Sequence, residues 1–332
     1  MNTTRGDRPP TSVDVARAAG VSQATVSYVL TDNPHARVSE ETRQRVRDAA
    51  ARLGYVPDAG ARALRTGRSG IVLVPLARAR TGRLAQHVFD EMEEEFRARG
   101  YTLVQYGERR LKGVPAAKSW LALRPVAVLV EAARLTKPAV DLLHASGARA
   151  VVGFSDEPSP LVPAVVLDHR ALGAVAARHL LERGRKRLAA IVPREEGIDA
   201  MGRARLAGVR QVAPDAERID LAFSEEEAGR IVRAGDLPDG IFAYNDEYAM
   251  LLISALQDAG LRVPEDVAVV GADDLPICTL MRPRLTSVHF DATATPAELV
   301  AAIDEIVRGE REATPGAVLD RMEPRLVIRA SA

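Results

Sequence analysis

From Ile71 onward the sequence alternates short apolar runs with longer amphipathic stretches, and this alternation limits the possible folds more than any other feature. The apolar runs are rich in valine and isoleucine, as expected for parallel strands that are buried on both faces. Strands of this kind joined by helical crossovers predict a doubly wound α/β sheet. The expected strands are 71–76, 101–106, 126–130, 149–154, 164–168, 187–193, 219–223, 240–245 and 267–274, and the clearest expected helices are 86–99, 170–183, 199–212 and 246–259.

About ten strands exceed what one open sheet holds comfortably, so the body at 70–332 is expected to form two parallel-sheet lobes. We place the first break near Pro163. The segments 287–291 and 325–330 are expected to pass back between the lobes. The predicted bounds are about 70–163 plus 290–320 for lobe one, and about 164–289 plus 321–332 for lobe two.

Residues 1–57 follow a different pattern and predict a small all-helical domain. Thr11 and Asp14 have the spacing of a capping box at the start of a helix. Gly20 suits a tight turn after that helix, because glycine adopts left-handed backbone conformations without steric cost. Ser22 and Ser39 are suited to cap two further helices. The predicted helices are Ser12 to Ala19, Gln23 to Leu30, and Ser39 to about Leu53.

The formal net charge of zero hides an asymmetry between the two ends of the chain. Residues 1–69 hold eleven arginines, no lysine and seven acidic residues, so they carry +4 and the remainder carries −4. A basic head on an acidic body is typical of a DNA-binding module joined to another domain. A solvated charged face would give the same balance, so charge alone leaves both readings open.

The cellular compartment is indicated by cysteine content and by the absence of long apolar runs. Cys278 is the single cysteine, which excludes an intramolecular disulfide and a thiolate zinc site and suits a reducing compartment. No apolar run approaches the ~18 residues that span a bilayer. Residues 1–10 lack the apolar core of a signal peptide. We therefore expect a cytoplasmic protein with no membrane partner.

Common catalytic motifs are missing from the sequence. There is no GxSxG, HExxH, GxxxxGK[ST] or GxGxxG motif, and Cys278 lacks a nucleophile signature. The histidines are scattered without the spacing of metal ligands. We therefore expect no enzymatic activity, no cofactor and no metal site. The histidines are His35, His87, His144, His169, His179 and His289.

The N-terminal domain carries the most specific motif of the chain. Ala16, Gly20 and Val26 have the spacing of a helix-turn-helix, with a small residue for close crossing, a glycine for the turn and an apolar residue to lock the helices. The strings TSVDVARAAGVSQATVSYVL and VSEETRQRVRDAAARLGYVPDAGARALRTG, within 11–67, closely resemble the DNA-binding head of the LacI/GalR family of bacterial transcription regulators.

The body also resembles this family, whose effector domain is similar to periplasmic sugar-binding proteins. The similarity is weakest over 77–125, where ARARTGRLAQ follows the first expected strand in place of the family's usual Asn-Pro-Phe-Phe-like segment. The matching pieces are RLAGV (205–209), FAYNDEYAM (242–250), GLRVPEDVAVVGADD (260–274), PRLTSV (283–288) and PRLVIRAS (324–331).

The resemblance implies that the second helix enters the major groove and that Gln23, Ala24 and Tyr28 contact bases. Glutamine can pair bidentately with adenine and alanine can touch a thymine methyl, whereas Tyr28 replaces the arginine common in the family. Hydroxyl and amide contacts to phosphate would position the helix without specifying sequence, and helix capping is their alternative role. These positioning residues are Thr11, Ser22, Thr25, Ser27 and Thr31.

The resemblance further implies a hinge helix within 58–69, formed when two subunits bind DNA together. Leu64 matches the leucine that wedges into a minor-groove step, and Ala61 matches the small residue beside it. Gly60 departs from the pattern, because glycine weakens a helix interior. The alternative for 58–69 is a plain linker.

In the body, the resemblance assigns effector contacts to Arg205, Asn245 and Asp273, and Asp168 is a further candidate together with Asp156. Asn245 and Asp273 lie at the carboxyl ends of expected strands, where open α/β sheets bind ligands. The alternative is a structural ion pair between Arg205 and Asp273.

These observations together predict a ligand-responsive transcription regulator. We expect a repressor that binds a palindromic operator in double-stranded DNA as a homodimer, since two-fold protein symmetry matches a palindrome. A small polar effector, sugar-like or another metabolite, is expected to bind between the lobes. The alternative is a cytoplasmic solute-binding protein without DNA function.

Overall fold

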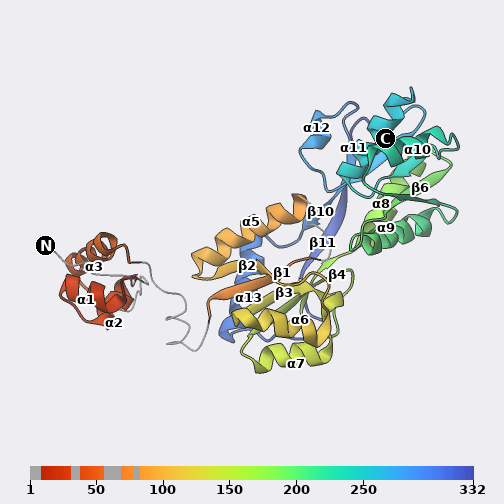
Figure 1. Cartoon of the computed structure of the whole chain (residues 1–332). Coiled ribbons are helices and arrows are strands. Elements are labelled where there is room, and N and C mark those ends of the chain that lie inside the picture. Colours follow the sequence, from red (N-terminus) through yellow and green to blue (C-terminus); the bar gives the residue numbers. More distant parts are fainter. Residues whose placement is uncertain (1–8, 31–37, 56–68, 78–82) are drawn as a thin grey trace. The chain divides into compact units, whose positions relative to one another are not determined.

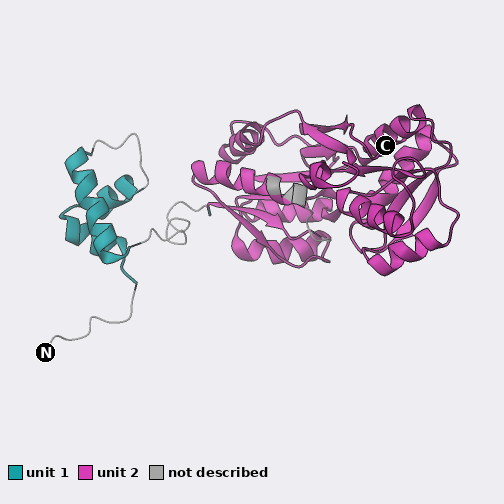
Figure 2. Cartoon of the chain, turned by 90° about the horizontal axis from the view of Figure 1, so that it is seen from above, with its two compact units in different colours: residues 1–69 teal, residues 70–332 magenta. Residues whose placement is uncertain are grey.

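The computed structural model describes residues 9–30, 38–55, 69–77 and 83–332. The chain divides into two compact units, Met1–Ser69 and Gly70–Ala332, which are coloured separately in Figure 2. Each unit has its own hydrophobic core and is described by itself.

Unit 1 consists of α1 (Ser12–Ala19), α2 (Gln23–Leu30) and α3 (Glu40–Leu53). The three helices bury a shared core that includes Val15, Val26 and Val46. The capping box predicted at the start of α1 is present, and Gly20 ends this helix with φ 67° in the left-handed region. The helices predicted from capping residues and apolar spacing are therefore confirmed.

Unit 2 is built on one sheet in which the described strands follow the order β2-β1-β3-β4-β5-β11-β10-β9-β8-β6-β7 (Figure 1). All neighbouring pairs are parallel except β10 with β11. The strands are β1 (Ile71–Pro75), β2 (Thr102–Tyr106), β3 (Ala127–Glu131), β4 (Ala150–Ser155), β5 (Ala164–Leu167), β6 (Leu188–Pro193), β7 (Glu217–Leu221), β8 (Gly240–Phe242), β9 (Ala268–Ala272), β10 (Thr286–Ala292) and β11 (Val318–Val327).

The two halves of this sheet meet along β11. Its first residues pair with β5, and its last residues pair with β10. We call β2-β1-β3-β4-β5 the first half and β10-β9-β8-β6-β7 the second half. β5 continues the first half beside β4, so the chain crosses to the second half one strand after the break expected near Pro163. The lobe bounds given above remain a prediction.

Helices cover both faces of each half. In the first half, α5 and α13 pack on one face and α6 and α7 on the other. In the second half, α8 and α9 cover one face, and α10 and α11 the other (Figure 1). These helices are α5 (Arg83–Ala98), α6 (Gly113–Trp120), α7 (Lys137–Ala145), α8 (His169–Glu182), α9 (Asp199–Val212), α10 (Glu225–Arg233), α11 (Asp246–Asp258) and α13 (Pro296–Arg308), with the short α12 (Ile277–Leu280) after β9.

Two glycines allow α8 and α9 to approach more closely than side chains permit. A Cβ atom at Gly173 would lie 1.9 Å from the Arg205 carbonyl oxygen, and one at Gly208 would lie 1.8 Å from the Arg170 carbonyl oxygen. Both distances are far inside van der Waals contact, so only glycine fits at these positions. This close packing brings Arg205 on α9 beside the start of α8.

The structure changes the bounds of several expected strands. β8 ends at Phe242 instead of residue 245, β9 ends at Ala272 instead of residue 274, and the closing strand β11 is Val318–Val327 instead of 325–330. β7 ends at Leu221, two residues earlier than the apolar run suggests, because the next two amides bond to side chains instead of a neighbouring strand. Ala222 N donates to Glu227 Oε2 at 2.9 Å, and Phe223 N donates to Glu195 Oε1 at 2.6 Å. Phe223 consequently leaves the sheet with a side chain that is 52% exposed.

Candidate functional site

The predicted base-contacting residues lie on one exposed surface of α2. Val26 and Val29 of this helix face the core, whereas Gln23, Ala24 and Tyr28 are exposed. Tyr28 has 44% of its surface accessible, which is high for a large aromatic side chain. Helical periodicity therefore separates the packing residues of α2 from residues that are free to contact another molecule.

Local hydrogen bonds set the start of α2 in place. Gln23 Nε2 donates to Ser12 Oγ at 2.8 Å, which ties α2 to the start of α1. Thr25 N donates to Ser22 Oγ at 3.1 Å, so Ser22 caps the helix as expected. Thr11 Oγ1 donates to Asp14 Oδ2 at 2.7 Å. Helix capping thus accounts for Thr11 and Ser22, and their phosphate contacts remain a prediction.

Three of the predicted DNA contacts, Thr31, Ala61 and Leu64, lie outside the described residues. Ser27, on α2 itself, is half-buried between the core and the exposed surface. The described residues therefore include the predicted recognition helix α2, whereas the hinge helix stays a prediction.

In unit 2, Arg205 is the centre of a buried polar cluster. This α9 residue is only 4% exposed. Its Nη1 donates to the Tyr244 carbonyl oxygen, and its guanidinium carbon lies 4.6 Å from the centre of the Tyr244 ring. Arg205 Nη2 lies 3.8 Å from Asp273 Oδ1. Two of the three residues that the resemblance assigned to the effector, Arg205 and Asp273, are thus brought together from α9 and the end of β9.

Asp273 and Asn245 occupy the carboxyl ends of neighbouring strands. Asp273 directly follows β9 with φ 101°, a conformation that costs energy for any residue other than glycine. Burial raises the pKa of this carboxyl, while the Arg205 charge opposes the shift. Asn245 follows β8, is 8% exposed, and caps α11 by accepting from Tyr248 N at 3.0 Å. The Asp273 carboxylate and the Asn245 amide therefore lie where α/β sheets usually bind ligands.

The remaining predicted residue, Asp168, caps α8. Its Oδ1 accepts a hydrogen bond from Ala171 N at 2.8 Å. Asp156, at the end of β4, lies 3.9 Å from Nε2 of the neighbouring His169. The cluster around Arg205 therefore continues toward the first half of the sheet.

Sequence reasoning gave no role to several residues of this cluster. Tyr248 Oη donates to Glu195 Oε2, and burial together with this carboxylate raises the pKa of Tyr248. The ring of Tyr248 also packs edge-on against Tyr244 and Phe223, with centroids 5.6 and 5.2 Å away. The signal available was the segment FAYNDEYAM, which contains both tyrosines but does not specify which partners they meet.

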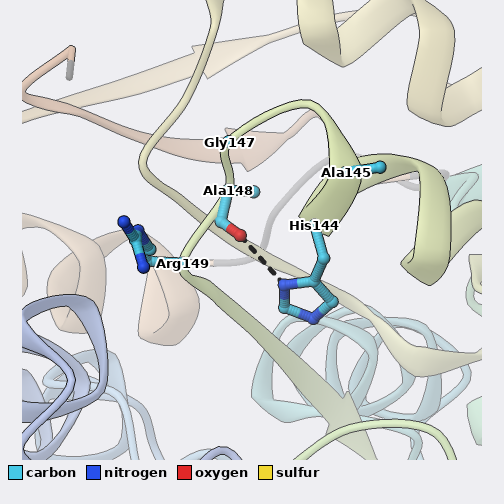
Figure 3. A pocket seen from close by; sticks show the side chains of 5 residues that line it. All are labelled: His144, Ala145, Gly147, Ala148 and Arg149. Atoms are coloured by element: carbon cyan, nitrogen blue, oxygen red, sulfur yellow. Dashed lines mark hydrogen bonds between the residues drawn. The ribbon is translucent and has the colours of Figure 1, made fainter. Parts of the chain in front are cut away.

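The two halves face each other at these strand ends. Arg110, between β2 and α6, forms an ion pair with Glu196, beyond β6, at 3.2 Å. A separate hollow of about 370 Å³ lies at the opposite end of the strands, between α7 and β4 (Figure 3). It is lined by His144, Ala145, Gly147, Ala148 and Arg149, and includes none of the predicted effector contacts.

Within the described part of the chain, no helix is both long and apolar enough to cross a membrane. In the same residues, no three His, Cys, Asp or Glu side chains are grouped so that they could hold a metal ion.

Comparison with known proteins decides the family. Residues 12–58 match the family model of bacterial regulatory proteins, lacI family, and residues 177–332 match a periplasmic binding protein-like domain. The chain is 30% identical to the HTH-type transcriptional repressor PurR of Pasteurella multocida (strain Pm70) over 338 residues, which cover 96% of this chain and 97% of the relative. The chain belongs to the lacI family. It is therefore a DNA-binding transcription regulator, and the alternative of a solute-binding protein without DNA function is not supported.

Solved structures agree with this assignment. The lacI-family chain is 26% identical to a transcriptional regulator CelR in complex with cellobiose, with a TM-score of 0.62 and coverage of 97% of this chain and 100% of that one. It shares the fold of a Lac repressor dimer bound to operator and the anti-inducer ONPF, at 22% identity, a TM-score of 0.74, and coverage of 98% and 99%. The predicted architecture, a helix-turn-helix head and a periplasmic-binding-protein-like α/β body, is confirmed.

Proposed function

We propose that this lacI-family regulator is a ligand-responsive repressor that binds a palindromic operator as a homodimer and senses a small polar effector in unit 2. The observation that carries the proposal is the convergence of Arg205, Asp273 and Asn245 at the carboxyl ends of the second-half strands. The proposed domains are 1–57 for DNA binding, 58–69 for the hinge and 70–332 for effector binding and dimerisation.

The proposed DNA contacts divide into two kinds. Gln23, Ala24 and Tyr28 contact base edges in the major groove from the exposed surface of α2. Leu64 and Ala61 enter the minor groove and stabilise a kink. Phosphate contacts from Thr11, Ser22, Thr25, Ser27 and Thr31 fix the orientation of the head.

The chemistry around Arg205 favours a ligand rich in hydroxyl groups. A buried guanidinium supplies donors, and Asp273 supplies an acceptor that lies at 3.8 Å, too far for a direct hydrogen bond to Arg205. A hydroxyl group can accept from one and donate to the other, so a sugar-like molecule satisfies both. Asn245 and Asp168 add further polar atoms at the same edge. The CelR relative, whose structure holds cellobiose, supports this class of ligand.

Regulation follows if the effector binds two arrangements of the halves with different affinity. A ligand shifts a conformational equilibrium only through such a difference. The coupling is reciprocal, so an effector that changes operator affinity must itself bind differently when operator is present. We propose that the protein works in the cytoplasm and performs no catalysis, in keeping with relatives named as transcription regulators.

Two measurements on the full-length protein test the proposal. Selection from random DNA duplexes should enrich a palindromic sequence, and failure to enrich any sequence would contradict the DNA assignment. A thermal-shift screen of sugars and other polar metabolites should then identify a compound that raises the melting temperature, because a ligand of the native state stabilises it.

A matched pair of variants locates the effector site. Arg205→Ala should reduce the thermal shift at a given ligand concentration, whereas Arg203→Ala should preserve it, since Arg203 lies on the same helix but pairs with Asp199 on the surface. An equal shift in both variants would place the pocket elsewhere.

A further inference from the structure

His169 occupies an unusual position between Arg205 and the first half of the sheet. It is the first residue of α8 and is 6% exposed. Arg205 Nε donates to His169 Nδ1 at 3.4 Å, and His169 Nε2 lies 3.9 Å from Asp156 Oδ1. The ring also packs edge-on against Phe290 of β10, with centroids 5.6 Å apart. One imidazole thus contacts α9, β4 and β10.

These contacts select one protonation state and one tautomer. Because Nδ1 accepts from a guanidinium, it cannot carry a proton. Burial and the Arg205 charge lower the pKa of His169 to about 3, so the ring is neutral at physiological pH. The remaining proton is therefore on Nε2, which faces the Asp156 carboxylate.

The Asp156 contact crosses between the halves of unit 2. Asp156 follows β4 in the first half, whereas Arg205 and the body of α8 pack on the second half. At 3.9 Å the Nε2–Oδ1 contact is longer than a hydrogen bond, so a small relative movement of the halves would close or open it. The adjacent Arg170–Glu157 pair, at 3.5 Å, spans the same boundary from the surface.

We propose that His169 is a positioning residue that couples the orientation of the Arg205 guanidinium to the position of Asp156 in the other half. This inference rests on the proposed effector role of Arg205 and deepens it. When the halves approach, Nε2–H of His169 donates a hydrogen bond to the Asp156 carboxylate. This hydrogen bond makes Nδ1 of the same ring a better acceptor for Arg205. When they separate, Arg205 loses part of the interaction that orients it toward Asp273.

Nuclear magnetic resonance of full-length protein with isotope-labelled histidine rings tests the protonation state. The His169 signals are identified by their loss in His169→Gln, and His144→Gln serves as the control because His144 is exposed and bonds only a backbone carbonyl. We expect His169 to stay neutral with its proton on Nε2 from roughly pH 5.5 to pH 8. An ordinary histidine, with a pKa of about 6.5, would change its protonation state within this range. A ring that titrates near the ordinary value, or carries its proton on Nδ1, overturns the proposal.

The Nε–H resonance of Arg205, identified by its loss in Arg205→Lys, tests the coupling. His169→Leu should abolish the hydrogen-bonded shift of this signal, and His169→Gln should restore much of it, because the glutamine oxygen can accept from Arg205. Asp156→Asn should move the same signal although Asp156 does not touch Arg205 Nε. An Arg205 signal that ignores the Asp156 change would show that His169 packs structurally and transmits nothing.

These measurements use no effector, so they separate the two hypotheses. If the ligand screen fails while the resonances behave as expected, the proposed effector role of Arg205 is wrong and the coupling stands. If Arg205→Ala abolishes ligand binding but Asp156→Asn leaves the Arg205 signal unchanged, the effector site stands and the coupling is wrong.

Discussion

The recognition helix in unit 1 and the polar cluster in unit 2 are built in opposite ways. The side chains that organise α2 and its neighbour bond within three to eleven residues of each other, and the predicted base contacts are exposed. Arg205 instead bonds partners 36 and 39 residues away and is almost fully buried. A DNA-contacting surface needs little tertiary support, whereas a buried guanidinium depends on the whole packing of its lobe.

The variant with the largest expected effect on stability is Gly208→Ala, which tests the dependence of unit 2 on close packing. The new methyl group would lie 1.8 Å from the Arg170 carbonyl oxygen, so α8 and α9 must separate. Overpacking of this kind costs about 3 kcal/mol of unfolding free energy. Urea unfolding should show that loss in unit 2 while the helical signal of unit 1 is unchanged.

Gly229→Ala is the matched control, because its Cβ meets only the end of the flexible Arg233 side chain, at 2.9 Å. Alanine is favoured over glycine in a helix by about 0.5–1 kcal/mol, so this variant should be neutral or slightly stabilised. Equal destabilisation by both substitutions would contradict the close-packing argument.

The next test separates the function of the two units. Arg205→Ala should weaken binding of a screened effector by roughly tenfold to a hundredfold, since a charged hydrogen bond contributes about 1.5–3 kcal/mol. Operator affinity in the absence of effector should change little, as measured by fluorescence anisotropy. Melting curves must accompany these data, because Asp273 loses its buried partner. A folded variant with normal effector response would make Arg205 structural.

Much of the contrast could be predicted from the sequence because local patterns determine unit 1. Thr11, Asp14 and Gly20 specify the bounds of α1, and the apolar runs locate the strands of unit 2. The end of β7 could not be predicted, since Glu195 and Glu227 reach it from other elements. The role of His169 was missed for the same reason: its neighbours Arg205 and Asp156 come from separate elements, and no spacing along the chain indicates that they meet.

Tyr28→Arg tests the recognition surface alone. If Tyr28 faces base edges, the substitution should change the preference for one base of the operator by about 1–3 kcal/mol, the range of a good bidentate contact. Non-specific, phosphate-driven binding should be unchanged or slightly stronger. Selection from random duplexes by both proteins gives the comparison. An identical consensus would mean that Tyr28 lies away from the bases.

The last comparison concerns two buried groups of unit 2 whose titrations oppose each other. Burial raises the pKa of Asp246 from 3.8 to about 7, and this carboxyl accepts from Ser287 Oγ at 2.6 Å and from Leu275 N at 2.7 Å. Its stabilising contribution is complete below its unfolded pKa and is lost as pH rises through about 7. His169 has a lowered pKa, so its contribution is complete above 6.5 and is lost as pH falls toward about 3.

Between these limits the two slopes should cancel in the natural protein. Asp246→Asn removes one titration, keeps one oxygen that can accept from Leu275 N, and leaves the Ser287 contact only if the new amide nitrogen donates to Ser287 Oγ. Its unfolding free energy should rise with pH relative to the natural protein by up to about 1.4 kcal/mol per pH unit between roughly pH 4 and 6.5. His169→Gln should give a slope of opposite sign, and the double variant should again be flat. Urea unfolding at several pH values measures all four proteins. All four proteins share every other titrating group. If the unfolding free energy of both single variants changed with pH in the same direction relative to the natural protein, Asp246 or His169 would be ionised differently from what its burial dictates.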